Sequence, residues 1–150
     1  MSFSIRKAAS EAKVAARQVA RLTGEQKRAV LMAISKHLVS QVSNILSANQ
    51  LDLEHAKTVG LDAAMVDRLT LTEERVMGIA NAVASIANQT DPVGEIKALK
   101  TMASGIQVGK MRIPLGVIAM IYESRPNVTI DAAALCFKAG NAVILRGGKE

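Results

Sequence analysis

Two short polar segments carry the side chains that could do chemistry in this sequence. The first, YESRPN, spans residues 122–127, and the second, RGGK, spans residues 146–149; each follows an apolar run. Arginine is the preferred side chain for planar recognition of phosphate or carboxylate groups. Paired glycines let the backbone approach a ligand closely. Together the two segments predict an anion site of the kind that α/β proteins build for phosphorylated cofactors and substrates.

Ser124, Arg125 and Asn127 are the candidate binding residues of the first segment. They stand where the chain has just left a buried strand and enters a helix, which is where open α/β sheets place their ligands. The alternative is a capping turn, in which Ser124 or Asn127 would satisfy free backbone donors of the helix. Arg125 favours the binding interpretation because of its affinity for phosphate and carboxylate.

Arg146, Gly147, Gly148 and Lys149 are the candidates in the second segment. The run is neither a GxGxxG fingerprint nor a P-loop, so it is weak as a motif. The first segment strengthens the prediction of a binding site here, because two parallel strands would bring both segments to the same edge of a sheet.

Other reactive residue types have structural explanations. Cys136, the single cysteine, lies on an apolar helix without a neighbouring histidine, so we expect a buried core thiol. His37 and His55 lie on polar helix faces without a second ligand at metal-site spacing. Glu73 and Glu74 are adjacent, so their carboxylates cannot face each other on a helix. We therefore predict no metal site and no carboxylate pair.

The elements that position the two segments begin with a helical part. Residues 1–94 show helical periodicity, with a capping box at Thr23 and Gln26 and an apolar stripe that runs from there until Gly60 ends it. A further helix opens at Thr72, whose following acids suit the first turn of a helix.

After the helical part the periodicity changes to that of strands. Residues 95–113 predict a hairpin that turns at Ser104–Gly105. The apolar run LGVIAMIY is typical of a strand covered on both faces, a helix follows over residues 126–140, and NAVILR is a second strand. This βαβ unit is too little sheet to stand alone, so we expect the opening third or so of a doubly wound α/β domain.

Composition excludes several function classes. With 2% aromatic residues, a surface of stacked rings is disfavoured, and one cysteine permits no intrachain disulfide. The net charge of +6 arises from cations at helical intervals without a dense block, which favours solvated helix faces over a nucleic-acid surface. The start lacks the apolar stretch of a signal peptide, and the longest apolar run is far shorter than a membrane span. We expect a cytoplasmic protein without a membrane partner.

Residues 112–150, with the run PLGVIAMIYESRPNVTIDAAALCFKAGNAVILRGGKE, closely resemble the gamma-glutamyl phosphate reductases, also called glutamate-5-semialdehyde dehydrogenases. The resemblance continues more loosely through the N-terminal helices. It implies the N-terminal portion of an aldehyde-dehydrogenase-like fold. Residues 1–94 would be the helical part of the dinucleotide-binding domain, 95–113 a hairpin that serves as oligomerisation arm, and 114–150 the start of a Rossmann-like sheet, with the catalytic domain absent.

The resemblance also implies an activity. The family, part of the aldehyde dehydrogenase superfamily, consists of oxidoreductases that use NADPH to reduce L-glutamate 5-phosphate to L-glutamate 5-semialdehyde and phosphate in proline biosynthesis. A cysteine thiolate displaces phosphate to give a thioester, which divides one difficult displacement into two easier steps. That cysteine would lie beyond residue 150, so this chain alone is expected to be inactive. The full-length enzyme is expected to be a homo-oligomer that binds a small-molecule substrate.

The resemblance assigns roles at both candidate segments. Superfamily members usually have lysine where this chain has Arg146, and commonly an acid where it has Lys149. A cation in place of the acid suits the 2′-phosphate of NADP, which an acid would repel. At the first segment, a gap-free register from Gly116 puts Arg125 at the superfamily's oxyanion position, whereas pairing the prolines puts Ser124 there. Both registers stay open.

Two further functions are compatible with the residues alone. The chain could be a non-catalytic module that binds a nucleotide or a partner subunit. It could also be a basic, largely helical nucleic-acid binder, whose affinity would fall steeply as salt rises.

Overall fold

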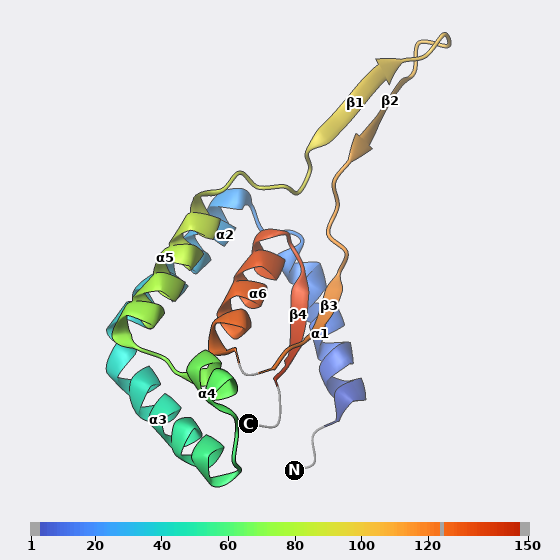
Figure 1. The fold of residues 1–150 in the computed structure, drawn as a ribbon. Helices are drawn as coiled ribbons and strands as arrows, with labels where there is room; N and C mark the ends of the chain where they lie inside the picture. The colour runs from blue at the N-terminus through green and yellow to red at the C-terminus, as the bar shows by residue number, and fades with distance from the viewer. Residues whose placement is uncertain (1–3, 124, 148–150) are drawn as a thin grey trace.

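The structure is a computed structural model that describes residues 4–123 and 125–147. Over these residues the chain forms a rounded body and one projecting hairpin (Figure 1). The elements, in chain order, are α1 (Ile5–Val19), α2 (Gly24–Ser40), α3 (Val42–Thr58), α4 (Ala63–Leu69), α5 (Glu73–Asn88), β1 (Ile96–Thr101), β2 (Gln107–Met111), β3 (Val117–Ile121), α6 (Pro126–Lys138) and β4 (Ala142–Arg146).

The predicted βαβ unit is present. β3 and β4 pair in parallel, in a register that runs from Val117 opposite Ala142 to Ile121 opposite Arg146. α6 connects the two strands and covers one face of the sheet, while α1 covers the other (Figure 1). Asn141 joins the starting ends of the strands, because its Oδ1 accepts from the Gly116 backbone N–H at 2.8 Å. The α/β fold class predicted from the sequence is confirmed.

The hydrophobic core lies between α2, α5 and α6. Its buried centre consists of Leu31, Val83, Ile86, Ala87 and Ala134. The capping box at Thr23 and Gln26 starts α2 as predicted, and the Thr72 hydroxyl accepts from a backbone N–H of the first turn of α5. Local capping thus sets where these helices begin, and the shared apolar core sets how they pack.

The stripe expected to continue to Gly60 is two helices rather than one. α2 and α3 meet at Gln41 with a bend of 69°. The bend carries α3 to the α4–α5 connection, where buried Asn49 donates to the Leu69 carbonyl at 2.9 Å and accepts from the Leu71 N–H at 2.8 Å. No single helix in the described ranges is long and apolar enough to cross a membrane; the bent pair meets such a test on length and composition alone.

One basic residue of the N-terminal part is not on a solvated face. Lys27 is 1% exposed, and its Nζ lies 2.7 Å from Asp91 Oδ1 and 3.3 Å from the Lys138 carbonyl oxygen. The buried Lys138 ammonium donates in turn to the Ala87 carbonyl at 2.9 Å. A cation can be buried where it is paired and hydrogen-bonded, which single-sequence periodicity does not reveal. We call Lys27, Asp91 and Lys138 the polar lock.

The pKa of Asp91, the carboxylate of the polar lock, is shifted by its surroundings. Partial burial by itself raises the pKa of Asp91. The hydrogen bonds from Lys27 and from the Val93 backbone N–H, and the charges of Lys27 and Lys138, outweigh that effect and lower the pKa below its ordinary value.

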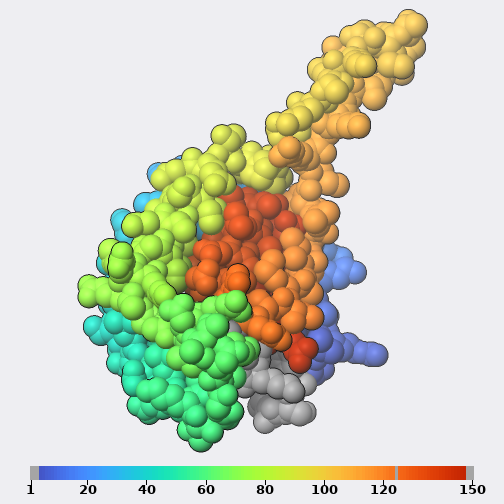
Figure 2. All heavy atoms as spheres, in the orientation of Figure 1, coloured from blue at the N-terminus to red at the C-terminus, as the bar shows by residue number. Residues whose placement is uncertain are grey.

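The hairpin projects from the body as an arm (Figure 2). It turns at Gly105, whose φ of 82° lies in the left-handed region, as predicted. At its base the Arg112 N–H donates to the Glu95 carbonyl at 2.9 Å, and the Gly94 N–H donates to the Arg112 carbonyl at 2.9 Å. The two ends of the arm are therefore held together where they leave the body.

A β-bulge sorts the side chains of the arm onto two faces. The register shifts between Lys97 and Lys100, with Ala98 at a φ of 53°. On one face Gly109 lies against Ile96 and Leu99, whose side chains would be 3.2 Å from an added Cβ. The register places Lys97 opposite Lys110, and Lys100 opposite Val108, on the other face. The arm therefore has one face with Ile96 and Leu99, and a second face with the three lysines and Val108.

Candidate functional site

The two polar segments meet at one edge of the sheet, as predicted. The Tyr122 backbone N–H, just after β3, donates to the carbonyl oxygen of Arg146, at the end of β4, at 3.1 Å. A Cβ added to Gly147 would lie 4.0 Å from the Tyr122 hydroxyl, so these segments approach closely. Three of the predicted site residues, Ser124, Gly148 and Lys149, lie outside the described residues.

Tyr122 ties the end of β3 to the first turns of α6. Its half-buried hydroxyl lies 2.5 Å from the Thr129 hydroxyl. This bond spans the strand-to-helix connection and thereby constrains the segment that holds Arg125. Tyr122 is therefore engaged with α6 rather than a free phenol.

The start of α6 does not follow the capping alternative at Asn127. Pro126 occupies the first helical position, where its missing N–H costs nothing. Arg125 is the residue at the cap position and makes no side-chain capping bond. The Asn127 amide instead donates to Asp131 Oδ2 at 3.2 Å, one turn further along the helix. Arg125 itself is exposed.

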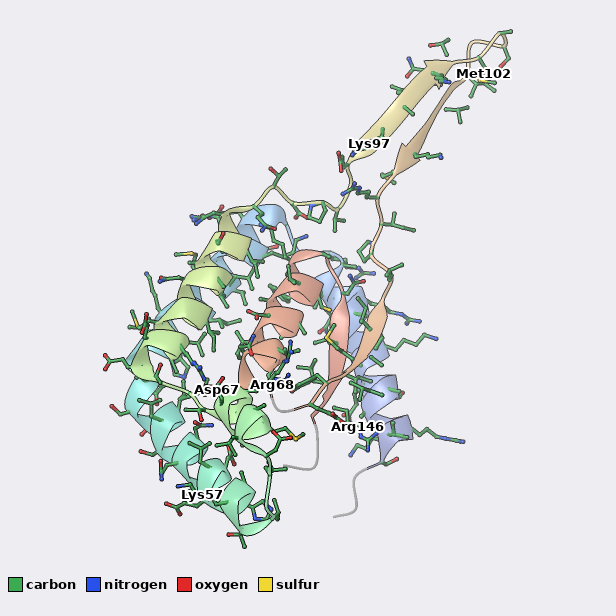
Figure 3. The ribbon with its side chains drawn as sticks, in the orientation of Figure 1. Lys57, Asp67, Arg68, Lys97, Met102 and Arg146 are labelled. Atoms are coloured by element: carbon green, nitrogen blue, oxygen red, sulfur yellow. The ribbon has the colours of Figure 1, made fainter. Side chains whose placement is uncertain are left out.

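An open cleft of about 450 Å³ adjoins this helix start and extends between α4, α5 and α6. Figure 3 shows Asp67 and Arg68 on α4, the short helix that forms one wall. The charged and polar lining residues include Asp67, Arg68, Arg75, Arg125, Asn127 and Asp131, and the apolar ones include Leu71, Ile79, Ala82 and Pro126.

The arginines of the cleft differ in how they are engaged. Arg75 donates to the Asp67 and Thr70 carbonyls at 2.6 and 2.7 Å and pairs with the Asp67 carboxylate at 3.0 Å. Arg75 therefore caps the carboxyl end of α4 by binding its free carbonyl groups. Across the described ranges, no acidic side chain forms an ion pair with Arg68 or Arg125. Together with the amino end of α6, these guanidinium groups favour an anionic ligand.

Comparison with known proteins gives this site its context. No protein-family model matches the chain. Curated gamma-glutamyl phosphate reductases match nearly all of it: the protein of Carboxydothermus hydrogenoformans is 51% identical over 142 residues, and that of Dehalococcoides mccartyi 53% over 148 residues. These alignments cover 95% and 99% of this chain.

The chain is therefore similar to gamma-glutamyl phosphate reductases along nearly all of its own length. It spans about a third of the length of the curated relatives, 34% and 35% of the two proteins named above. The resemblance inferred from the sequence is thereby confirmed.

Solved structures of gamma-glutamyl phosphate reductases confirm the fold. The Thermotoga maritima structure is 34% identical and superposes with a TM-score of 0.90 over 95% of this chain and 34% of its own. The Saccharomyces cerevisiae structure is 31% identical and gives a TM-score of 0.93 over 99% of this chain and 38% of its own. The described body and arm therefore correspond to a portion of the reductase fold.

Cys136 has the environment predicted for a core thiol. It is buried on α6, and burial raises the pKa of its thiol above the ordinary value. A raised pKa disfavours the thiolate, which is the nucleophilic form. Within the described residues, no group of three or more histidine, cysteine or acidic side chains could hold a metal ion.

Sequence reasoning missed the far side of the cleft. Arg68 comes from α4, a helix of seven residues that periodicity did not detect, and Asp131 was assigned only to the helix as a whole. A signal was present in the sequence, since Asn127 and Asp131 stand four residues apart and therefore on one face of a helix.

Proposed function

We propose that the protein acts in the NADPH-dependent reduction of L-glutamate 5-phosphate to L-glutamate 5-semialdehyde and phosphate, a cytoplasmic step of proline biosynthesis. The observation that carries the proposal is identity of about half the residues, over 95% or more of the chain, to proteins named for the reduction of gamma-glutamyl phosphate. An anion-favouring cleft beside the carboxyl edge of the sheet suits such a substrate.

The proposed chemistry has two balanced steps. A cysteine thiolate, which the resemblance places beyond residue 150, attacks the acyl carbon and the carbon–oxygen bond to phosphate breaks, leaving a thioester. Hydride addition to the thioester carbon then breaks the carbon–sulfur bond and returns the thiolate, with the aldehyde as product. When bound, NADPH supplies the hydride. Arg125, exposed at the amino end of α6, would donate to the acyl oxygen or to the phosphate.

Two residues at the carboxyl end of β4 suit a phosphorylated cofactor. Arg146 is exposed at the last position of the parallel register, so its guanidinium can reach a phosphate group. Gly147, which has no Cβ beside the Tyr122 hydroxyl, leaves room for close approach. These two residues would contribute to the part of the site that holds the 2′-phosphate, which favours NADPH over NADH.

The arm is proposed to serve association between copies of the full-length enzyme. Large apolar side chains of the arm are exposed, among them Ile96 at 59% and Leu99 at 58%. Exposed strand edges and apolar faces are normally covered by a partner.

The experiment is a reductase assay on the protein at its full natural length. We expect NADPH oxidation that depends on L-glutamate 5-phosphate, with one phosphate released per NADPH, and slower reaction with NADH. Aspartate 4-phosphate, shorter by one carbon, is the control substrate. We expect Arg125→Ala to lower kcat or kcat/KM at least about tenfold, equivalent to 1.4 kcal/mol. Absence of substrate-dependent NADPH oxidation in the unmodified protein would reject the proposed function.

A further inference from the structure

We infer that the cleft between α4, α5 and α6 binds the amino-acid end of the substrate, with Asp131 on its α-ammonium group and Arg68 on its α-carboxylate. The inference deepens the proposed function and rests on it. It adds what recognises a glutamyl group in particular, which the reduction of an acyl phosphate does not by itself require.

The direction of the cleft sets which end of the substrate it receives. Arg125 and Pro126, which line the cleft, stand at the start of α6, just after the connection from β3. Asp131 lines it one turn further along α6, and Arg68 lines it from α4. The reacting acyl carbon must lie near the sheet edge because the proposed cofactor site is there. The amino-acid end of the same molecule then points into the cleft.

The distances along α6 match the size of the substrate. Asn127 and Asp131 stand four residues apart, which is about 6 Å along a helix axis. That rise is comparable to the extended five-carbon chain of glutamate. A substrate whose acyl phosphate lies at the start of α6 therefore brings its amino-acid end to the level of Asp131. A cleft of about 450 Å³ is ample for a molecule of this size.

The cleft has charges of both signs, as the binding of a zwitterion requires. Asp67 and Arg75 pair with each other and largely cancel. The remaining groups are the guanidinium groups of Arg68 and Arg125 and the carboxylate of Asp131, which the Asn127 amide orients through Oδ2. One anion and two cations complement a ligand that carries an ammonium group, a carboxylate and a phosphate.

Gly78 supports a ligand in this space. It is the sixth residue of α5, where glycine is a poor helix former, and it lines the cleft. A Cβ there would meet nothing within 4 Å, and its backbone is not in the positive-φ region, so neither packing nor conformation calls for glycine. What glycine does provide at this position is open volume in the wall of the cleft.

Binding of three small ligands tests the assignment, measured by calorimetry on the full-length protein. L-Glutamate has both α-groups, glutarate lacks the ammonium group, and 4-aminobutyrate lacks the α-carboxylate. We expect Asp131→Asn to weaken L-glutamate binding at least tenfold and to leave glutarate binding unchanged. We expect Arg68→Ala to weaken L-glutamate and glutarate alike and to leave 4-aminobutyrate unchanged.

Matched controls and a gain-of-stability variant complete the test. Asp52→Asn and Arg6→Ala change exposed charges on α3 and α1 and should alter none of the affinities. Gly78→Leu should raise the melting temperature, because leucine favours the helix, while it lowers L-glutamate affinity by filling the cleft. Undiminished L-glutamate binding in Asp131→Asn, Arg68→Ala and Gly78→Leu would overturn the inference.

The inference and the proposed function fail in distinguishable ways. Selective L-glutamate binding with the expected variant pattern, in a protein without NADPH-dependent reduction, would keep the amino-acid site and reject the reaction. Reductase activity whose KM for L-glutamate 5-phosphate is unchanged in Asp131→Asn and Arg68→Ala would keep the reaction and reject this site.

Discussion

At the scale of single residues, the two members of a buried ion pair contribute unequally to the free energy of unfolding. The Lys27–Asp91 pair of the polar lock is an example. Lys27 is 1% exposed, whereas the Asp91 side chain is 22% exposed. Water can therefore reach the carboxylate but not the ammonium group. The ammonium group of Lys27 therefore depends on Asp91 for its counter-charge, whereas the Asp91 carboxylate can also be solvated by water.

We expect Asp91→Asn to lower the free energy of unfolding by about 3 kcal/mol, because it leaves the Lys27 ammonium buried without its counter-charge. Lys27→Met should cost only about 1 kcal/mol, since Asp91 keeps its bond from the Val93 N–H at 3.0 Å and partial contact with water. Urea denaturation of both variants measures the difference. Equal losses would contradict this account of the lock.

The lowered pKa of Asp91 gives the lock a pH dependence. A folded-state pKa below the unfolded value means that the stabilisation is present above the ordinary value of 3.8 and is lost as pH falls through the folded pKa. The difference in unfolding free energy between wild type and Asp91→Asn should therefore be full at neutral pH and shrink below about pH 4. A difference that stays constant down to the acid range would assign the effect of Asp91 to packing rather than charge.

Residues of the site could be predicted only where local pattern and position agree. Arg125 and Arg146 follow apolar strands, so their place at the sheet edge could be deduced from a parallel βαβ unit. Arg68 lines the same cleft as Arg125 but comes from α4, across a separation in sequence that periodicity does not span. Lys27 looked like one cation of a solvated face because its partners, Asp91 and Lys138, are far away in sequence.

At the scale of elements, the sequence predicts where helices begin but not how consecutive helices are oriented. The capping box at Thr23 and the acids after Thr72 fix the starts of α2 and α5 from adjacent residues alone. The bend at Gln41 depends on where Asn49 finds its partners, Leu69 and Leu71. An apolar stripe has the same period on one straight helix and on two bent ones, so the bend could not be read from it.

The bulge of the arm makes a prediction at this scale. A non-glycine residue at a φ of 53° is strained by roughly 1 kcal/mol, and a β-branched side chain there is strained further. We expect Ala98→Gly to keep or slightly raise the protection of arm amides in native-state hydrogen exchange, and Ala98→Val to lower it. Greater protection in Ala98→Val would show that the bulge is not the conformation in solution.

At the scale of the whole molecule, the arm and the body are separable. The Arg112 N–H donates to the Glu95 carbonyl at the base of the arm. The same bond would join these two residues if only a two-residue turn connected them. We therefore expect that replacing residues 96–111 with Asn-Gly preserves the helical circular dichroism of the body. The proposed association through the arm predicts that the same change in the full-length protein reduces the molar mass measured by light scattering.

Two point variants identify the face of the arm that associates. Because burial of apolar area drives association, the proposed role of the arm predicts that Leu99→Ser weakens association and that Lys100→Ser does not. An unchanged molar mass in the arm-deleted enzyme would show that association uses another surface.

The polar lock also has a consequence for how the chain is made. Asp91 follows Lys27 by 64 residues, and Lys138 follows Lys27 by 111, so 47 residues separate the arrival of the second and third members. At about 5–20 residues per second, a ribosome takes on the order of 2–9 s to add them. During that interval α2 and α5 can already pair while the place of α6 in the core stays empty. The nascent helices therefore expose an apolar groove to solvent for several seconds. At this stage the chain is most prone to aggregate and benefits most from a chaperone.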